Sequence, residues 1–285
     1  MNRLMRMYFY GIFGAIGGLF SWHISNLLGL SFTKSLFLSE LIIGGLLGLS
    51  IGLMIGIAEG IITKNPVSIL RAGLISGGLG LLGGLIGLPV AEGIFQFAGG
   101  ALLGRIIGWG ILGFLIGLAV GITGGSQMWK GGLGGLLGGV LGGFLLEAAR
   151  QLLSLPLYGK AAGLILLGLS IGLFIAMIVF MLSRAWLEVV SGKLKGTEFI
   201  LDKFKTVNGP SAIIGSDALK SDIVFPDPDI SPQHAMLQGT DTHFVLKDMS
   251  LSGTYINNRR IEEAKLSNGQ KIRLGNTEFV YREKR

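Results

Sequence analysis

The sequence contains no cysteine and few charged residues. The absence of Cys excludes disulfide frameworks, thiolate nucleophiles and Cys-based zinc sites. Only 14% of the 285 residues are charged, whereas an average soluble domain has about 25%. In contrast, 50% of the chain is hydrophobic and 49 residues are Gly. This composition is not that of an ordinary cytosolic enzyme.

The charged residues are divided unevenly along the chain. Residues 1–190 contain 15 of them and 41 of the 49 glycines, whereas residues 191–285 contain 26 charged residues in half the length. The net charge of +7 is the sum of +5 in the first part and +2 in the second. No block of basic residues indicates a surface for nucleic acid, and we expect no nucleic-acid partner. The division predicts that the first part lies in lipid and the second in water.

Six stretches of the first part predict membrane-spanning helices. A helix needs about 20 apolar residues to cross the hydrocarbon layer, which is roughly 30 Å thick. The stretches without Asp, Glu, Lys or Arg are residues 7–33, 41–58, 72–91, 106–129, 131–146 and 161–183. We therefore expect transmembrane helices at about residues 8–30, 38–62, 69–95, 102–123, 128–148 and 161–183.

Basic residues in short loops predict the orientation of these helices. One set of helix ends carries Arg3, Arg6, Lys64, Arg71, Lys130, Arg184, Lys193 and Lys195. The opposite set carries only Lys34, Arg150 and Lys160. The excess predicts a multi-pass protein of the cell membrane with both termini in the cytoplasm.

The helices form three similar hairpins. The second helix of each contains a related segment, at residues 48–53, 113–118 and 168–173. Such a pattern favours duplication of one hairpin, and a pseudo-threefold bundle is compatible with it.

Glycines recur along one face of two of the expected helices. They are Gly44, Gly48, Gly52, Gly56 and Gly60 in one helix, and Gly73, Gly77, Gly80, Gly84 and Gly87 in the next. Small residues at these spacings allow close approach of helices in lipid. We expect packing within the chain, with homo-oligomerisation or sliding during gating as alternatives.

Three ionisable residues form a candidate intramembrane polar site. Aligning the first helices of the hairpins on Gly14, Gly83 and Gly138 places three side chains at one position. They are His23, Glu92 and Glu147. Ionisable groups in a span are candidates for function, but these lie near the expected outer end. The alternative is therefore that they contact water or headgroups.

The second part of the chain has the pattern of a small β-sandwich. Short β-type runs alternate with turn residues, such as Asn208-Gly209-Pro210 and Asn268-Gly269. We expect a glycine-rich six-helix domain at residues 1–183, a juxtamembrane linker at 184–195 and the sandwich at 196–285.

Four motifs in this region occur in the order found in forkhead-associated (FHA) domains. They are Ile213-Ile214-Gly215, Ser231-Pro232-Gln233-His234, the segment from Ser250 to Asn257, and the segment from Leu266 to Gly275. Residues 196–283 therefore resemble an FHA domain, a β-sandwich that generally recognises phosphothreonine peptides. The resemblance implies that Gly215, His234, Gly253, Thr254 and Asn257 shape the binding loops.

The sequence departs from the family at the positions that contact the phosphopeptide. The phosphate-binding Arg of the family is replaced by Ser216, and the residue after the motif Ser231 is Pro232. The usual Thr-Asn pair is replaced by Leu251-Ser252. An Arg fork gives charge-assisted bidentate bonds to phosphate, so its loss predicts a degenerate pocket, unless Lys220 compensates as a point charge.

These features favour an interaction protein over an enzyme. The sequence has no nucleophile elbow, phosphate loop or metal-ligand spacing in a suitable context, and we expect no cofactor or metal. Our leading interpretation is a membrane-anchored signalling or scaffold protein whose FHA-like domain docks a protein partner, with a phosphothreonine protein as one candidate. The alternative is a channel, pore or transporter regulated by that domain.

Overall fold

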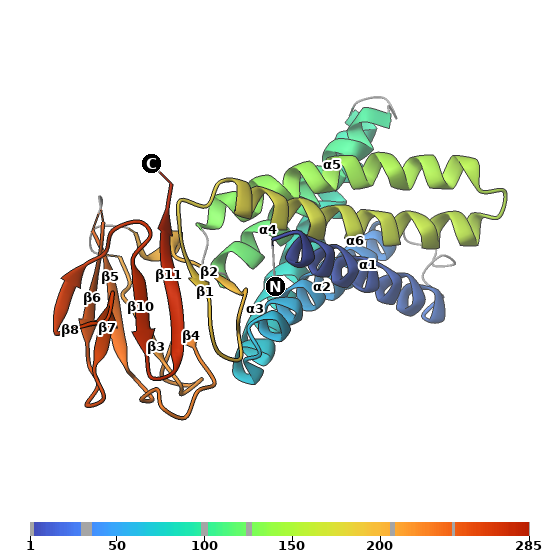
Figure 1. The fold of residues 1–285 in the computed structure, drawn as a ribbon. Coiled ribbons are helices and arrows are strands. Elements are labelled where there is room, and N and C mark those ends of the chain that lie inside the picture. The colour runs from blue at the N-terminus through green and yellow to red at the C-terminus, as the bar shows by residue number, and fades with distance from the viewer. Residues whose placement is uncertain are drawn as a thin grey trace.

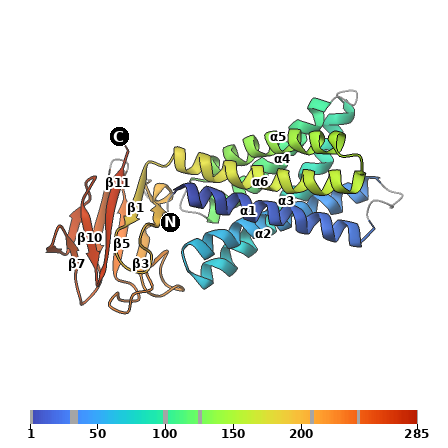
Figure 2. The same ribbon diagram turned by 45° about the vertical axis from the view of Figure 1, so that its right-hand side comes forward.

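The computed structural model describes residues 3–29, 36–97, 102–123, 127–205, 209–240 and 243–284. A bundle of helices occupies one end of the molecule and a β-sandwich the other, and both chain ends lie near their junction (Figure 1). Figure 2 shows the helices side by side, with the sandwich at one end of the bundle.

The six expected helices are present. They are α1 (Arg3–Leu27), α2 (Leu36–Ile62), α3 (Pro66–Phe97), α4 (Leu102–Thr123), α5 (Met128–Leu152) and α6 (Pro156–Met181). Among the described residues, five segments are long and apolar enough to cross a membrane: Leu41–Ile62, Pro66–Phe97, Gly104–Thr123, Met128–Leu152 and Pro156–Met181. Helix α1 is not among them. Lys34, which contributed to the expected orientation, lies outside the described residues.

The helices close into a ring with three similar close contacts. Each helix packs against the next one in the chain, and α6 packs against α1. Glycine backbones meet in three pairs of helices: Gly48 with Gly80 in α2 and α3, Gly113 with Gly135 in α4 and α5, and Gly168 with Gly14 in α6 and α1. A Cβ atom at any of these six positions would overlap the carbonyl group of its partner. The contacts recur at equivalent positions of the repeated segments, so the ring has a pseudo-threefold arrangement.

The glycine faces of α2 and α3 are used within this chain. Gly44, Gly48, Gly52, Gly56 and Gly60 lie against the backbone of α3, and Gly73, Gly77, Gly80, Gly84 and Gly87 lie against α2 or α4. These faces are therefore not free to mediate the homo-oligomerisation that we considered.

Aliphatic side chains from the second helix of each hairpin fill the interior of the ring. Three equivalent sets belong to one buried cluster: Leu47, Leu112 and Leu167; Ile51, Ile116 and Ile171; and Ile55, Val120 and Ile175. Each of these side chains is at most 6% exposed. The described helices therefore enclose a packed apolar interior.

The sandwich consists of two sheets. Its strands are β1 (Ala185–Val189), β2 (Glu198–Ile200), β3 (Ala212–Gly215), β4 (Ile223–Val224), β5 (Ala235–Gly239), β6 (Phe244–Asp248), β7 (Thr254–Ile256), β8 (Arg259–Ile261), β9 (Glu263–Lys265), β10 (Lys271–Leu274) and β11 (Thr277–Glu283). One sheet has the order β2-β1-β11-β10-β7-β8 and the other β4-β3-β5-β6-β9. All pairs are antiparallel except β3 with β4.

The expected linker at residues 184–195 is wrong, because it contains strand β1. Ala185–Val189 pairs with β11 on one side and with β2 on the other. The sandwich therefore begins at Ala185, four residues after the end of α6 at Met181, and not at residue 196.

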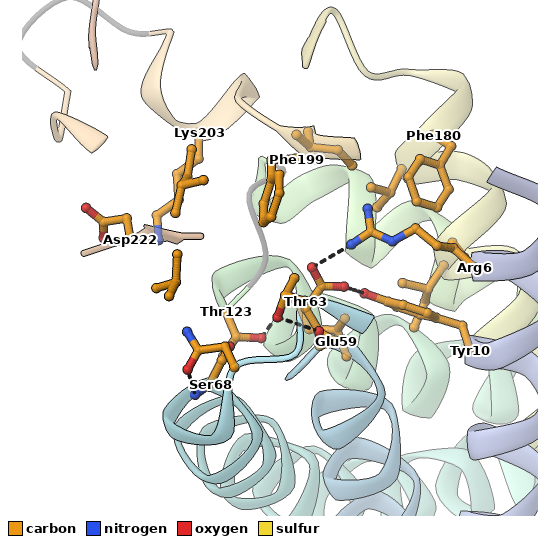
Figure 3. A pocket seen from close by; sticks show the side chains of 18 of the residues that line it. Arg6, Tyr10, Glu59, Thr63, Ser68, Thr123, Phe180, Phe199, Lys203 and Asp222 are labelled. Atoms are coloured by element: carbon orange, nitrogen blue, oxygen red, sulfur yellow. Dashed lines mark hydrogen bonds and ion pairs between the residues drawn. The ribbon is translucent and has the colours of Figure 1, made fainter. Parts of the chain in front are cut away.

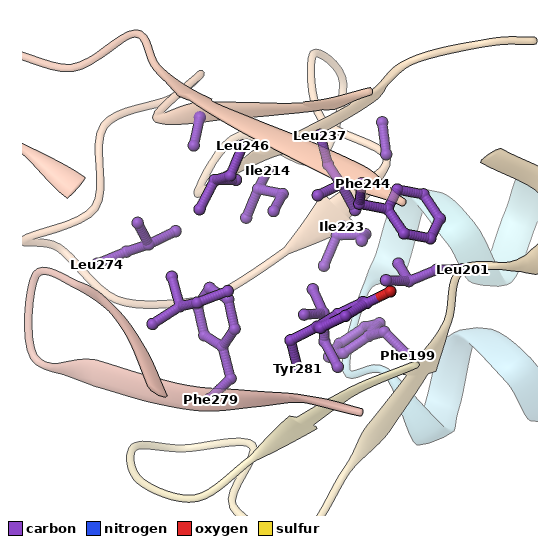
Figure 4. Packing of buried hydrophobic residues seen from close by; sticks show 14 of the residues in the cluster. Phe199, Leu201, Ile214, Ile223, Leu237, Phe244, Leu246, Leu274, Phe279 and Tyr281 are labelled. Atoms are coloured by element: carbon purple, nitrogen blue, oxygen red, sulfur yellow. The ribbon is translucent and has the colours of Figure 1, made fainter. Parts of the chain in front are cut away.

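The sandwich has its own hydrophobic core. Figure 4 shows side chains from both sheets packed together, with Phe279 and Tyr281 of β11 facing Ile214, Leu237 and Leu246. Every residue of this cluster lies between Ala185 and Tyr281. This cluster therefore contains no side chain from the helices.

A buried ion pair fastens the sandwich to the bundle. Nζ of Lys130, on α5, donates to Oδ2 of Asp202 at 2.6 Å and to the Leu182 carbonyl at 2.9 Å. The other oxygen of Asp202 accepts from the backbone N–H groups of Arg184 and Ala185. Both charged side chains are 2% exposed. The four hydrogen bonds compensate for the loss of water around the two buried charges.

A second network crosses the same junction at the ends of α1 and α2. Arg6 of α1 donates to Glu59 of α2 at 2.9 Å and to the backbone carbonyl of Glu198 in β2 at 2.6 Å. The Tyr10 hydroxyl donates to the second oxygen of Glu59 (Figure 3), and Arg3 pairs with the Glu198 carboxylate at 2.8 Å. These contacts hold the sandwich against the helix ends.

Candidate interaction site

Three loops of the sandwich contain the site residues expected from the sequence. The first loop joins β3 to β4 at residues 216–222, the second joins β4 to β5 at 225–234, and the third joins β6 to β7 at 249–253. Ser216 and Lys220 lie in the first loop, Ser231 and Pro232 in the second, and Leu251 and Ser252 in the third.

The first two loops are joined by hydrogen bonds to backbone carbonyls of the second loop. The N–H of Ser216 donates to the Ser231 carbonyl at 3.0 Å, and the Ser216 hydroxyl donates to the Ile230 carbonyl at 2.7 Å. The Ser221 hydroxyl donates to the Pro232 carbonyl at 2.7 Å. A Cβ atom at Gly215 would overlap this same carbonyl, so the close approach of the loops requires glycine there.

His234 connects the second loop to the third. Its Nδ1 accepts from the N–H of Ser231 at 3.1 Å, and its Nε2 lies 3.1 Å from the Ser250 hydroxyl and 3.3 Å from the Gly253 carbonyl. The ring is fully buried. These contacts fit a neutral imidazole with its proton on Nε2, and they fix the loops that carry Ser231 and Leu251.

The third loop is further held by Asp248 at the end of β6. Its Oδ1 accepts from the hydroxyls of Ser250 and Thr254, each at 2.9 Å. Burial raises the pKa of the Asp248 carboxyl, but the hydrogen bonds from Ser250 and Thr254 outweigh it and leave this pKa below its ordinary value. The pKa of His234 is also lowered, chiefly because burial disfavours the imidazolium.

Two of the expected loop-shaping residues adopt left-handed backbone conformations. Gly253 has φ +87° and Asn257 has φ +49°, a region that Gly and Asn tolerate better than other residues. The Asn257 side-chain oxygen accepts from the N–H of Lys271 at 3.1 Å, which ties the turn after β7 to β10.

Several apolar side chains are exposed on these loops, beside polar ones such as Lys220 and Gln233. Leu251 is 100% exposed and Leu219 82%. Met249, Pro232 and Ser252 are also exposed. Exposed apolar side chains on loops are candidates for contact with a partner.

Two cations lie at this end of the sandwich. Lys220, which we considered as a substitute for the family's Arg, is 64% exposed at the side chain and lies 4.0 Å from Asp217. Arg260 of β8 was not singled out from the sequence, yet its guanidinium contacts the Leu251 carbonyl at 3.5 Å. Arg260 reaches the third loop because β8 pairs with β7. This pairing could not be predicted from the sequence alone.

The candidate polar site in the bundle is only partly assembled. Glu92 of α3 and Glu147 of α5 line one cavity of about 230 Å³, and Glu147 pairs with Arg150 at 3.3 Å and with Arg105 at 3.8 Å. His23 does not line this cavity.

The alignment that grouped His23 with the two glutamates is wrong by three residues. Gly17, Gly83 and Gly138 occupy equivalent positions, because they lie against Ser50, Leu115 and Ser170, the third residues of the three repeated segments. Counting nine residues onward leads to Asn26, Glu92 and Glu147. The residue of α1 that corresponds to the glutamates is therefore Asn26.

A comparison with family models matches residues 212–275 to the FHA domain. The C-terminal part of this chain is therefore an FHA domain, and the expected fold class is confirmed. The match covers less than a quarter of the chain, so it assigns a family to this domain and not to the helical part.

Curated relatives match the same part of the chain. The glycogen accumulation regulator GarA of Mycobacterium tuberculosis is 32% identical over 98 residues, which cover 34% of this chain and 56% of the relative. The oxoglutarate dehydrogenase inhibitor of Corynebacterium jeikeium is also 32% identical, with coverage of 34% and 63%. The chain thus spans less than two thirds of the length of these relatives, which are a regulator and an inhibitor.

A solved structure is similar over the same region. The FHA domain of the CT664 protein from Chlamydia trachomatis is 32% identical, with a TM-score of 0.33 and coverage of 36% of this chain and 100% of that one.

Proposed function

We propose that the chain is a membrane-anchored interaction protein whose FHA domain docks a protein partner with little dependence on phosphorylation. The helical bundle is the anchor in this proposal, and both termini and the FHA domain are cytoplasmic. Five apolar segments of sufficient length support the anchor, and the packed interior of the ring favours it over the alternative of a pore.

The observation that carries the proposal is that the Ser216 hydroxyl is already engaged in a hydrogen bond within the protein. Ser216 occupies the position of the family's phosphate-binding Arg, and its hydroxyl donates to the Ile230 carbonyl within the protein. A hydroxyl also lacks the charge and the planar fork of a guanidinium. Each hydrogen bond to a charged group is worth about 1.5–3 kcal/mol, so losing a bidentate contact weakens phosphate binding severely.

The exposed apolar side chains indicate how a partner is held instead. Leu251 replaces a polar ligand of the family and is fully exposed, and Leu219 and Pro232 are exposed on the other two loops. Burying one Leu against a partner contributes about 1.5–3 kcal/mol. We infer that the partner presents an apolar patch to these loops.

A capture experiment with the full chain tests this function. The wild type, Leu251→Asp and the control Gln238→Asp, at an exposed residue of β5, are used as baits with untreated and phosphatase-treated lysate. The proposal predicts a partner that is retained after phosphatase treatment, lost with Leu251→Asp and kept with the control. Capture that disappears after phosphatase treatment and tolerates Leu251→Asp contradicts it.

Topology is tested separately by reporter fusions at residues 34, 65, 98, 127 and 154. The signals are expected to alternate, beginning outside at 34, because successive loops lie on opposite sides of the membrane. Equal signals at neighbouring loops contradict the proposed six-span anchor.

A further inference from the structure

A cavity of about 260 Å³ lies between the helix ends and the FHA domain. Its polar lining comes from both parts of the molecule: Asn65 just before α3, Ser68 and Arg71 from the start of α3, Thr123 from the end of α4, and Lys203, Ser221 and Asp222 from the sandwich. Figure 3 shows the adjoining cavity, which shares Ser68, Thr123, Lys203 and Asp222 with this one.

The two cations of this cavity have no acidic partner among the described residues. Arg71 is exposed and forms no ion pair in this part of the chain. Lys203 donates only to the Ile122 carbonyl, at 3.4 Å. By contrast, Arg3, Arg6 and Lys130 at the same junction are all paired with carboxylates.

One carboxylate, that of Asp222, also lines the cavity. Its Oδ2 accepts from the backbone N–H of Ile213 at 2.9 Å, so it is engaged in holding β3. Two cations and one carboxylate leave the lining with one net positive charge. A ligand with a single negative charge, such as a phosphodiester, balances it.

Apolar residues continue the cavity along the helices. Ile75, one turn beyond Arg71 on α3, is 37% exposed, and Ile122 of α4 is 42% exposed. Helix α3 has 32 residues and is about 48 Å long, whereas the hydrocarbon layer is about 30 Å thick. Helix α3 is therefore long enough to extend beyond the hydrocarbon layer, and Arg71 lies in its second turn.

From these features we propose that the cavity binds an anionic phospholipid. The phosphodiester lies between Arg71 and Lys203, the hydroxyl of Ser68 reaches the headgroup, and an acyl chain runs along Ile75 and Ile122. The proposal rests on the membrane location given under the proposed function. Because Lys203 and Ser221 belong to the FHA domain, the lipid bridges this domain and the bundle beside the 216–222 loop.

Native mass spectrometry of the full chain in detergent tests the site. Phosphatidylglycerol is titrated against phosphatidylcholine, and inorganic phosphate is added as a competitor. We expect a preference for phosphatidylglycerol of roughly thirtyfold, the effect of two basic residues near an anionic lipid. The double variant Arg71→Gln/Lys203→Gln is expected to abolish the preference. Lys265→Gln, at an exposed residue of β9, is the control that retains it.

The remaining outcomes each overturn the proposal. Equal binding of the two lipids, or a preference that survives the double variant, excludes the site. Full displacement by inorganic phosphate, or binding of a phosphothreonine peptide that is lost in the double variant, assigns the cavity to another ligand. Failure of the protein to float with vesicles of any composition contradicts the membrane location itself, whereas stable insertion without lipid preference leaves the anchor intact.

Discussion

At the residue scale, His234 is the group on which the three loops depend. It bonds to Ser231, Ser250 and Gly253 from a fully buried position. Its role as a loop-shaping residue could be expected from the family motif, but its contacts could not, because they join residues up to 19 positions apart in the chain.

The lowered pKa of His234 predicts that acid destabilises the FHA domain. The unfolded chain takes up a proton at the ordinary pKa of about 6.5, whereas the folded domain does so only at lower pH. Between these values the unfolded state binds more protons, so the free energy of unfolding falls as the pH falls below about 6.5.

Urea unfolding of residues 184–285 between pH 7.5 and 5.5, followed by Trp186 fluorescence, measures this effect. The isolated domain is suitable because the hydrophobic core of the sandwich contains only residues of the sandwich. His234→Gln is expected to be less stable at neutral pH and to lose part of the pH dependence, whereas His243→Gln retains it. An unchanged slope in His234→Gln contradicts the assignment.

At the scale of elements, apolar runs were sufficient to predict six helices, because the absence of charge over about 20 residues is a strong signal. Strand β1 was missed since Arg184 and Trp186 are also typical of a membrane interface, and pairing with β11 is invisible in the sequence. The register of α1 was misjudged because glycines recur there at spacings of three and four, which permits two alignments.

The close contact between α2 and α3 predicts a sharp difference between two neighbouring glycines. A Cβ atom at Gly80 would overlap the carbonyl of Gly48, whereas Gly78 has nothing within 4 Å of such an atom. Gly80→Leu is expected to destabilise the bundle by at least the 1–3 kcal/mol typical of overpacking, and Gly78→Leu to have little effect.

Thermal unfolding in detergent, followed by circular dichroism, compares these two variants. A similar loss of stability in both would show that this face of α3 does not pack as described.

At the scale of the whole molecule, the buried pair of Lys130 and Asp202 joins the two parts. The sequence offered only a Lys at the start of an apolar helix and an Asp 72 residues later, so the pair was not predicted. Removing one partner of such a pair costs about 3–5 kcal/mol, because the remaining charge stays buried without compensation.

Lys130→Met is therefore expected to loosen the FHA domain from the bundle. Hydrogen exchange of the junction amides should accelerate. Adding Asp202→Asn should restore part of the protection, because it removes the unpaired charge. The Asn side chain also retains a carbonyl acceptor for the N–H groups of Arg184 and Ala185. Lys64→Met is the control, since Lys64 also crosses the junction but contacts only the Lys193 carbonyl at an exposed position. Equal effects of Lys130→Met and Lys64→Met would contradict the role of the buried pair.

The central claim is that the FHA domain binds its partner through apolar loops and not through phosphate. Calorimetric titration of the full chain with a phosphothreonine peptide library tests this claim most directly. We expect no binding tighter than the millimolar range, because Ser216 supplies no fork of charged donors. Micromolar binding that disappears on dephosphorylation, and weakens in Ser231→Ala, Lys220→Ala or Arg260→Ala, would contradict the claim and show that other cations replace the missing Arg.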